Sequence, residues 1–312
     1  MADIAGAISS MVALLIITAL GFLAAKLGYL NKGNRQNFSN LLFNITLPCT
    51  ILASVGSMDA DSGGELIATA FALAIAKFII MSAFSALCNV VLRVPKAERH
   101  IYLFMGLFVN VGFIGISVVE SIYGGGAAFL GSIFMSIFNL CFYGIGINFT
   151  LLVSADGAKP KFDPKNLISA PFIASIAAIA LFFSGFQLPD FLDQAISLTG
   201  AATAPLAMML VGLNMALADM KSVFTEKRLY AFTVLRFLVL PAVAFLIARI
   251  FVADPLALGV FTMMLAMPVG TLAPALCSTY NQDTLLATKG VIITTLASFI
   301  IIPILIAFTA LV

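Results

Sequence analysis

Charge is scarce in this sequence, and that scarcity decides the class of protein. Only 10% of the 312 residues are charged, whereas 62% are hydrophobic, and the mean hydropathy is +1.13. A soluble domain needs far more charge to cover its surface. The composition therefore excludes a soluble globular protein and indicates an integral membrane protein.

Residues that carry enzyme chemistry are equally few. Histidine occurs once, as His100 in a basic loop, and no set of metal ligands surrounds it, so no metal site is expected. The four cysteines lie in apolar segments without a CxxC pair and are expected to pack as small hydrophobic residues. The motifs GxxxxGK[ST] and HExxH are absent, as are paired intramembrane carboxylates. We therefore expect no enzyme, no ATP hydrolysis, no cofactor and no nucleic-acid partner.

What the sequence has in abundance is long apolar runs. A membrane-spanning helix needs about 20 predominantly apolar residues. Ten segments meet this requirement, separated by turn and charge signals: 6–28, 37–56, 64–92, 101–122, 127–153, 167–186, 193–217, 229–252, 255–278 and 284–311. The sequence predicts an all-α membrane protein with ten transmembrane helices.

Basic residues orient these helices in the bilayer. The loops after the first, third, fifth and seventh helices hold most of the 16 Lys and Arg residues: Lys26, Lys32, Arg35, Arg93, Lys96, Arg99, Lys159, Lys161, Lys165, Lys221, Lys227 and Arg228. The other loops hold only Arg249, at a helix end. The positive-inside rule makes the basic loops cytoplasmic. We expect a multi-pass protein of the plasma membrane or bacterial inner membrane, with both termini on the extracytoplasmic side.

The chain also repeats itself. A shift of 157 residues places Thr46 on Thr203 and Tyr123 on Tyr280, and a small further slip places Lys77 on Arg236. Because each half contains five helices, an odd number, the second copy must insert upside down, as in many secondary transporters. We predict two inverted five-helix repeats, residues 1–155 and 156–312.

The fourth helix of each half is interrupted at the same place. Asn110 and Gly112 lie in the first interruption, and Pro268, Gly270 and Thr271 lie in the second. Proline removes an amide donor, and glycine lowers the cost of non-helical backbone. Freed backbone groups are tolerated in a membrane only inside protein or beside a wet cavity. The two breaks predict a shared substrate site, and half-helix N-termini there suit an anion. The alternative is that these residues only kink packed helices.

Polar residues within the spans add candidates for this site. Lys77 and Arg236 are repeat-related cations without a matching acid at mid-span, which favours an anionic substrate. The alternative for each is snorkelling or pairing with helix carbonyls. Asn44 and Asn139 are further candidates because an amide in lipid needs a partner. Lys289 is expected at the interface with Asp283 nearby, and most intramembrane threonines are expected to bond their own helix carbonyls.

Five stretches are spread in order along the whole chain: "GYLNKGNRQNFSNLLFNITLPCTIL", "NVGFIGISVVESIYG", "LRFLVLPA", "AMPVGTLAPALCSTYNQD" and "TTLASFIIIPIL". Together they resemble the auxin efflux carrier family, including its bacterial malate/malonate permease-like members. The resemblance implies a fold like that of the bile-acid/sodium symporters. Helices 1, 2, 6 and 7 would form a scaffold, and helices 3–5 and 8–10 a moving transport domain. Broken helices 4 and 9 would cross at the site.

Two departures bear on the substrate. The loop after the fifth helix is short, unlike that of the plant carriers, and Val111 occupies the position that aligns with Pro268. Auxin is therefore a poorly supported substrate, and a small organic anion is expected instead. The leading hypothesis is a secondary transporter for carboxylates with elevator-like alternating access. An anion channel and a non-transporting sensor on a transporter fold stay open. So do proton coupling, sodium coupling, uniport and a homodimer.

Overall fold

Every regular element in the described part of the chain is a helix. The computed structural model describes residues 4–57, 63–141, 170–186, 188–270, 273–274, 277 and 283–311. The elements are α1 (Ile4–Lys26), α2 (Arg35–Leu41), η1 (Leu42–Thr46), α3 (Leu47–Ala53), η2 (Ser54–Ser57), α4 (Gly63–Val91), α5 (Arg99–Leu107), η4 (Val111–Ile116), α6 (Ser117–Tyr123), α7 (Gly125–Cys141), α9 (Ala170–Ser184), α10 (Asp190–Ala201), α11 (Thr203–Leu217), α12 (Met220–Val223), α13 (Lys227–Val234), η7 (Leu235–Val239), α14 (Leu240–Ala248), α15 (Pro255–Leu265) and α17 (Thr284–Leu311).

These helices include several that suit a bilayer. Four are long and apolar enough to cross a membrane: Gly64–Val91, Asp190–Leu217, Lys227–Ala248 and Thr284–Thr309. Five further apolar helices are shorter, among them Ala170–Ser184 and Pro255–Leu265. The all-helical class is confirmed for the described residues. The count of ten spans and the inverted relation of the two halves stay predictions.

Large apolar side chains on the outside of the protein agree with a lipid environment. On α4, Ile75, Ile79 and Leu87 are 47%, 61% and 55% exposed, while Lys77 and Met81 on the same helix are buried. In water such a stripe would be an aggregation surface, whereas acyl chains solvate it. This helix therefore presents one face to lipid and one to protein.

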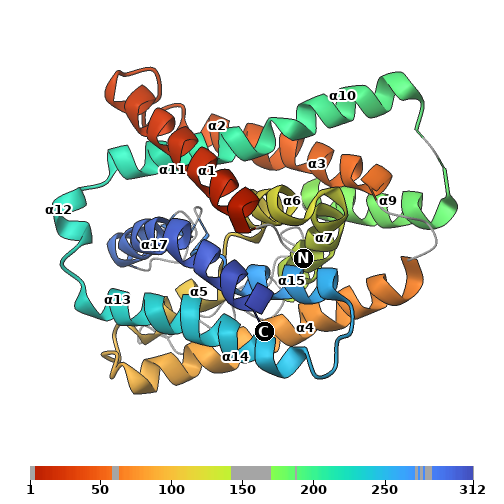
Figure 1. The fold of residues 1–312 in the computed structure, drawn as a ribbon. Helices are drawn as coiled ribbons and strands as arrows, with labels where there is room; N and C mark the ends of the chain where they lie inside the picture. Colours follow the sequence, from red (N-terminus) through yellow and green to blue (C-terminus); the bar gives the residue numbers. More distant parts are fainter. Residues whose placement is uncertain are drawn as a thin grey trace.

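One group of helices is joined by very close backbone approaches. α1 lies along α11, where a Cβ at Gly21 or Gly212 would collide with the backbone of the other helix. α3 crosses α10, and the Thr50 hydroxyl lies 2.8 Å from both the Gly200 carbonyl oxygen and the Thr203 hydroxyl. Figure 1 shows α1, α2, α3, α10 and α11 together on one side of the molecule. This group corresponds to most of the helices that the resemblance assigns to a scaffold.

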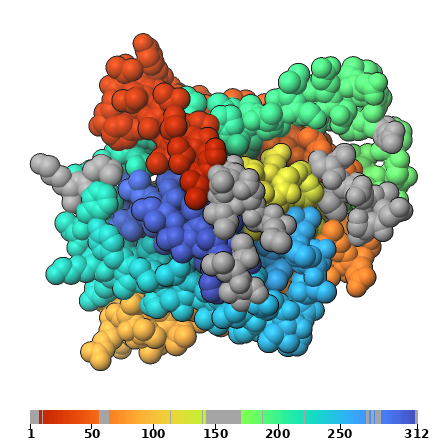
Figure 2. All heavy atoms as spheres, viewed as in Figure 1, coloured from red at the N-terminus to blue at the C-terminus, as the bar shows by residue number. Residues whose placement is uncertain are grey.

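A second group lies on the opposite side. α4 packs against α5, α7 and α15, and α17 packs against α13 and α14. In Figure 1 α4, α5, α13 and α14 form the lower side, with α6, α7, α15 and α17 between the two groups. Figure 2 shows α1, in red, resting directly on α17, in blue, and the two helices are in contact. The middle layer is where the interrupted helices meet.

In the described part of the chain, three segments are π-helical, with a wider turn than an α-helix. η1 and η7 each end just before a proline near the start of the next helix, Pro48 in α3 and Pro241 in α14. Proline lacks the amide that would continue the ladder, so the change of winding falls where a normal bond is missing. The third segment, η4, follows the interruption at Asn110.

Candidate functional site: a crossover of two interrupted helices

Two helices stop in the middle of the protein. α5 ends at Leu107, and Phe108 leaves helical geometry with φ −83° and ψ 87°, before winding resumes at Val111. α15 ends at Leu265, and residues 267–270 are not helical. Pro268 accounts for the second stop, since it has no amide to donate to the preceding turn. The sequence prediction of an interruption near Asn110 and another near Pro268 is confirmed.

The two interruptions bind to each other through their backbones. The Asn110 amide donates to the Pro268 carbonyl at 2.8 Å, and the Gly270 amide donates to the Phe108 carbonyl at 2.9 Å. Val109 and Val269 therefore lie opposite each other in an antiparallel bridge. Each interruption supplies hydrogen-bond partners for the groups that the other has freed, which is how non-helical backbone survives away from water. We call residues 108–110 and 268–270 the crossover.

Asn110 has a defined local role at this crossover. It is 4% exposed, its Oδ1 accepts from the Ile114 amide at 3.3 Å, and its carbonyl accepts from the Gly115 amide at 2.9 Å. An asparagine oxygen that binds an amide in the first turn is an N-cap. Asn110 thus starts the η4–α6 helix, whose positive end lies at the crossover.

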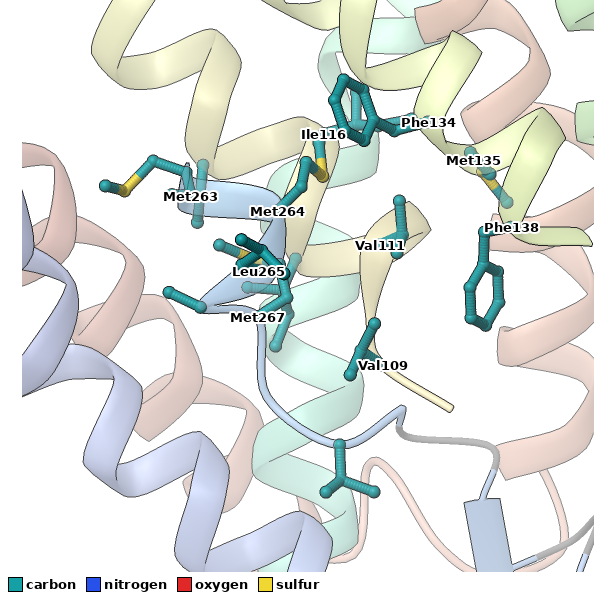
Figure 3. Close-up of a cluster of buried hydrophobic side chains, with 14 of the residues drawn as sticks. Val109, Val111, Ile116, Phe134, Met135, Phe138, Met263, Met264, Leu265 and Met267 are labelled. Carbon is teal, nitrogen blue, oxygen red and sulfur yellow. The ribbon is translucent and has the colours of Figure 1, made fainter. Parts of the chain in front are cut away.

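Glycines let neighbouring groups pack closely around the crossover. A Cβ at Gly270 would lie 2.5 Å from Cε1 of Phe108, and one at Gly112 would lie 2.9 Å from Cε of Met135. Figure 3 shows Met264 and Leu265 from α15, and Met267 just after it, on one side of Val109 and Val111, with Met135 and Phe138 from α7 on the other. Unbranched methionines fill such irregular spaces well. The crossover is thus enclosed mainly by apolar side chains.

Two buried cations lie close to the crossover but are used differently. Lys77 is 2% exposed, and its Nζ lies 5.5 Å from the centroid of the Phe138 ring, whose own centroid is 6.0 Å from that of Phe108. Lys77 has no hydrogen bond or ion pair with any residue that the structure describes. A buried ammonium without an anionic partner is costly, so its neighbourhood favours an anion.

Arg236 is bonded instead to the end of a helix. It is 1% exposed, its Nη1 donates to the Leu265 carbonyl, and its Nη2 lies 3.8 Å from Sδ of Met81. Leu265 is the last residue of α15. The alternative considered from the sequence, pairing with helix carbonyls, is what the structure shows for this cation.

Comparison with known proteins identifies the family. The model of the family described as "Membrane transport protein" matches residues 7–161 and 158–306, nearly the whole chain. The chain belongs to the membrane transport protein family. It is also similar to Uncharacterized transporter MJ1031 of Methanocaldococcus jannaschii, with 24% identity over 310 residues that cover 92% of this chain and 94% of the relative. The resemblance found in the sequence is confirmed at the level of the family.

The remaining candidate residues of this membrane transport protein are placed unevenly. Asn44 is exposed, and its side-chain amide donates to the Asn40 carbonyl of its own helix at 3.0 Å and not to a group of the crossover. Asn139 belongs to α7, but its side chain lies outside the described part, as does Thr271. Lys289 pairs with Glu226 at 3.2 Å and not with Asp283, because the α12–α13 connection reaches the start of α17.

One residue of the crossover was missed by sequence reasoning. Thr294 on α17 accepts a hydrogen bond from the Val269 amide at 3.1 Å, while its own hydroxyl donates to the Gly290 carbonyl at 2.7 Å. The expected bond to its own helix is therefore present, but a second partner shares the same oxygen. No local pattern distinguishes it from Thr288, which bonds its own helix in the same way but is only half-buried.

Proposed function

We propose that this membrane transport protein is a secondary transporter that moves a small organic anion, a carboxylate, across a cell membrane. The observation that carries the proposal is Lys77, a buried cation that has no anionic partner among the described residues and lies over the Phe138 ring, which is next to Phe108 of the crossover. A carboxylate placed there would neutralise the charge of Lys77. Asn110, Gly112, Pro268 and Gly270 would shape the site, with Thr271 and Asn139 as further candidates.

The proposed movement is elevator-like. Helices 1, 2, 6 and 7 would stay fixed while helices 3–5 and 8–10 carry the crossover across the membrane. The close packing of α1 on α11 and of α3 on α10 supports a rigid scaffold. In this proposal residues 1–155 and 156–312 are two five-helix repeats inserted with opposite orientation.

The proposed energy source and membrane rest on the sequence alone. A gradient would drive transport, with proton coupling, sodium coupling and uniport as alternatives. The bilayer would be the plasma membrane or a bacterial inner membrane, with both chain ends extracytoplasmic. A homodimer is compatible with the proposal.

The first test is binding followed by counterflow. Purified protein is screened by thermal shift against C3–C6 carboxylates and indole acids, because a ligand of the folded form raises the melting temperature by mass action. The labelled form of the best carboxylate is then used in proteoliposomes. Saturable counterflow supports a carrier. Flux without counterflow identifies an anion channel, and binding without flux identifies a sensor.

Lys77 offers a direct test of the site. Lys77→Met removes the ammonium and keeps a long apolar side chain, so we expect it to abolish the thermal shift caused by the carboxylate. The matched control is Lys227→Met, which removes an exposed cation at the start of α13. Undiminished carboxylate affinity in Lys77→Met would remove Lys77 from the site.

A further inference from the structure

The interruption of α15 leaves two specific backbone groups without their helical partners. In an unbroken helix the Leu265 carbonyl would accept from the amide four residues later, that of Val269. In the structure these two groups do not bind each other. The Val269 amide donates to Oγ1 of Thr294, and the Leu265 carbonyl accepts from Nη1 of Arg236. Each half of the missing helical bond is thus taken by a side chain from a different helix, η7 for Arg236 and α17 for Thr294.

The environment of these side chains suits the replacement of a backbone bond. Arg236 is 1% exposed and Thr294 is fully buried, so water does not compete for either bond. The C-terminal end of a helix carries partial negative charge, which a guanidinium stabilises. No acidic side chain pairs with Arg236 among the described residues. Its Nη2 lies near Sδ of Met81, and its Cζ lies 5.6 Å from the centroid of the Phe237 ring. Its charge is therefore directed at α15.

The repeat-related cation does not do the same. Lys77 faces the Phe138 ring. At the first interruption, backbone amides bond nearby carbonyls of the same segment: the Val109 amide donates to the Leu107 carbonyl at 3.1 Å, and the Val111 amide donates to the Val109 carbonyl at 2.9 Å. Among the described residues, side chains of two other helices bond the second interruption, at the Leu265 carbonyl and the Val269 amide. The two cations therefore have different tasks.

We infer that Arg236 and Thr294 are positioning residues that hold α15 open at the crossover, whereas Lys77 is the cation left for an anion. When either side chain is removed, one backbone group of the interruption loses its partner away from water, so residues 266–270 open more readily and Pro268 and Gly270 separate from their partners at Asn110 and Phe108. The consequence for transport rests on the proposed function, but the clamp itself does not.

The test is hydrogen–deuterium exchange of the full-length protein in detergent, without substrate. Arg236→Met and Thr294→Val each remove one of the two bonds. We expect about tenfold faster exchange of the amides of Ala266, Met267, Val269 and Gly270 in each, equivalent to about 1.4 kcal/mol. Arg236→Lys, which can still donate one bond, should fall between Arg236→Met and wild type. The matched control is Lys77→Met, an equally buried cation, which should leave this segment unchanged.

The double variant provides a readout that general destabilisation would not give. Because both side chains replace one helical bond, the effects of Arg236→Met and Thr294→Val on residues 266–270 should be less than additive. Unchanged exchange in both single variants would overturn the inference, as would an equal rise in Lys77→Met. If Arg236→Met exchanges faster throughout the chain, Arg236→Lys and Thr294→Val decide: a rise confined to the crossover supports the clamp, and no rise overturns it. Failure of carboxylate transport would leave this result untouched, since no substrate is present.

Discussion

Gly270 lies so close to the Phe108 ring that an alanine at this position should destabilise the protein. In Gly270→Ala the new Cβ would lie 2.5 Å from Cε1 and 2.6 Å from Cδ1 of the Phe108 ring. Carbon atoms pack best at about 3.5–4.0 Å, so the ring or the backbone must move by about 1 Å. The ring is itself stacked on Phe104, with centroids 5.4 Å apart, and therefore has little room to retreat.

The expected cost follows from this displacement. Overpacking in a well-packed interior costs about 1–3 kcal/mol. The same movement pulls apart the two backbone bonds of the crossover, so Gly270→Ala should lower the melting temperature and strongly reduce transport. Gly64→Ala is the matched control, because a Cβ there meets nothing within 4 Å and the position is in a helix. Alanine should leave stability unchanged or raise it slightly at that position.

The assay is thermal unfolding in detergent together with initial rates of carboxylate counterflow in proteoliposomes. The two variants should separate clearly, with Gly64→Ala close to wild type in both measurements. If Gly270→Ala melts and transports like wild type, the close packing of the two interruptions is not a feature of the working protein.

Three further outcomes are expected. Asn110→Ala removes the N-cap of the η4–α6 helix and should lower the free energy of unfolding by about 1 kcal/mol, measured by thermal or denaturant unfolding; no loss would show that the cap is dispensable. Glu226→Gln should destabilise by about 1.5–3 kcal/mol because its lysine partner is only 8% exposed, whereas Glu98→Gln, in an exposed pair at 4.0 Å, should cost under about 1 kcal/mol; equal losses would contradict the difference in burial. In a cysteine-free background, Val109→Cys with Val269→Cys should form a disulfide on oxidation, read as loss of maleimide labelling. The reason is that directly opposed residues of a non-hydrogen-bonded antiparallel pair have Cα atoms about 4.5 Å apart. Persistent labelling would show that the two residues are not paired.

The positions of the interruptions could be predicted from the sequence because they have local causes. Pro268 lacks an amide wherever it lies, and Asn110 is a residue that favours helix starts. Helix boundaries followed the apolar runs for the same reason, as with α4 at Gly63–Val91 against the expected 64–92. Each of these features depends on neighbours within about one helical turn.

The partners of the freed groups could not be predicted in this way. Which carbonyl receives the Asn110 amide, and that Arg236 bonds the end of α15, depend on how helices far apart in sequence approach each other. Arg236 and Lys77 have the same charge and are both buried, and the carbonyl and the ring that surround them distinguish them. Asn44 shows the limit most simply, since its own helix satisfies the amide that was expected to need a distant partner.

The antiparallel bridge also restricts how the protein can change shape. Two backbone hydrogen bonds join segments that are far apart in the sequence, Phe108 and Asn110 to Gly270 and Pro268. The site is buried, so water does not replace a bond that is lost. A movement that separates the two interruptions would break both bonds and leave two amides and two carbonyls without partners, at a cost of several kcal/mol. A substrate bound at the crossover would therefore move together with both interrupted helices, and not be released by their separation.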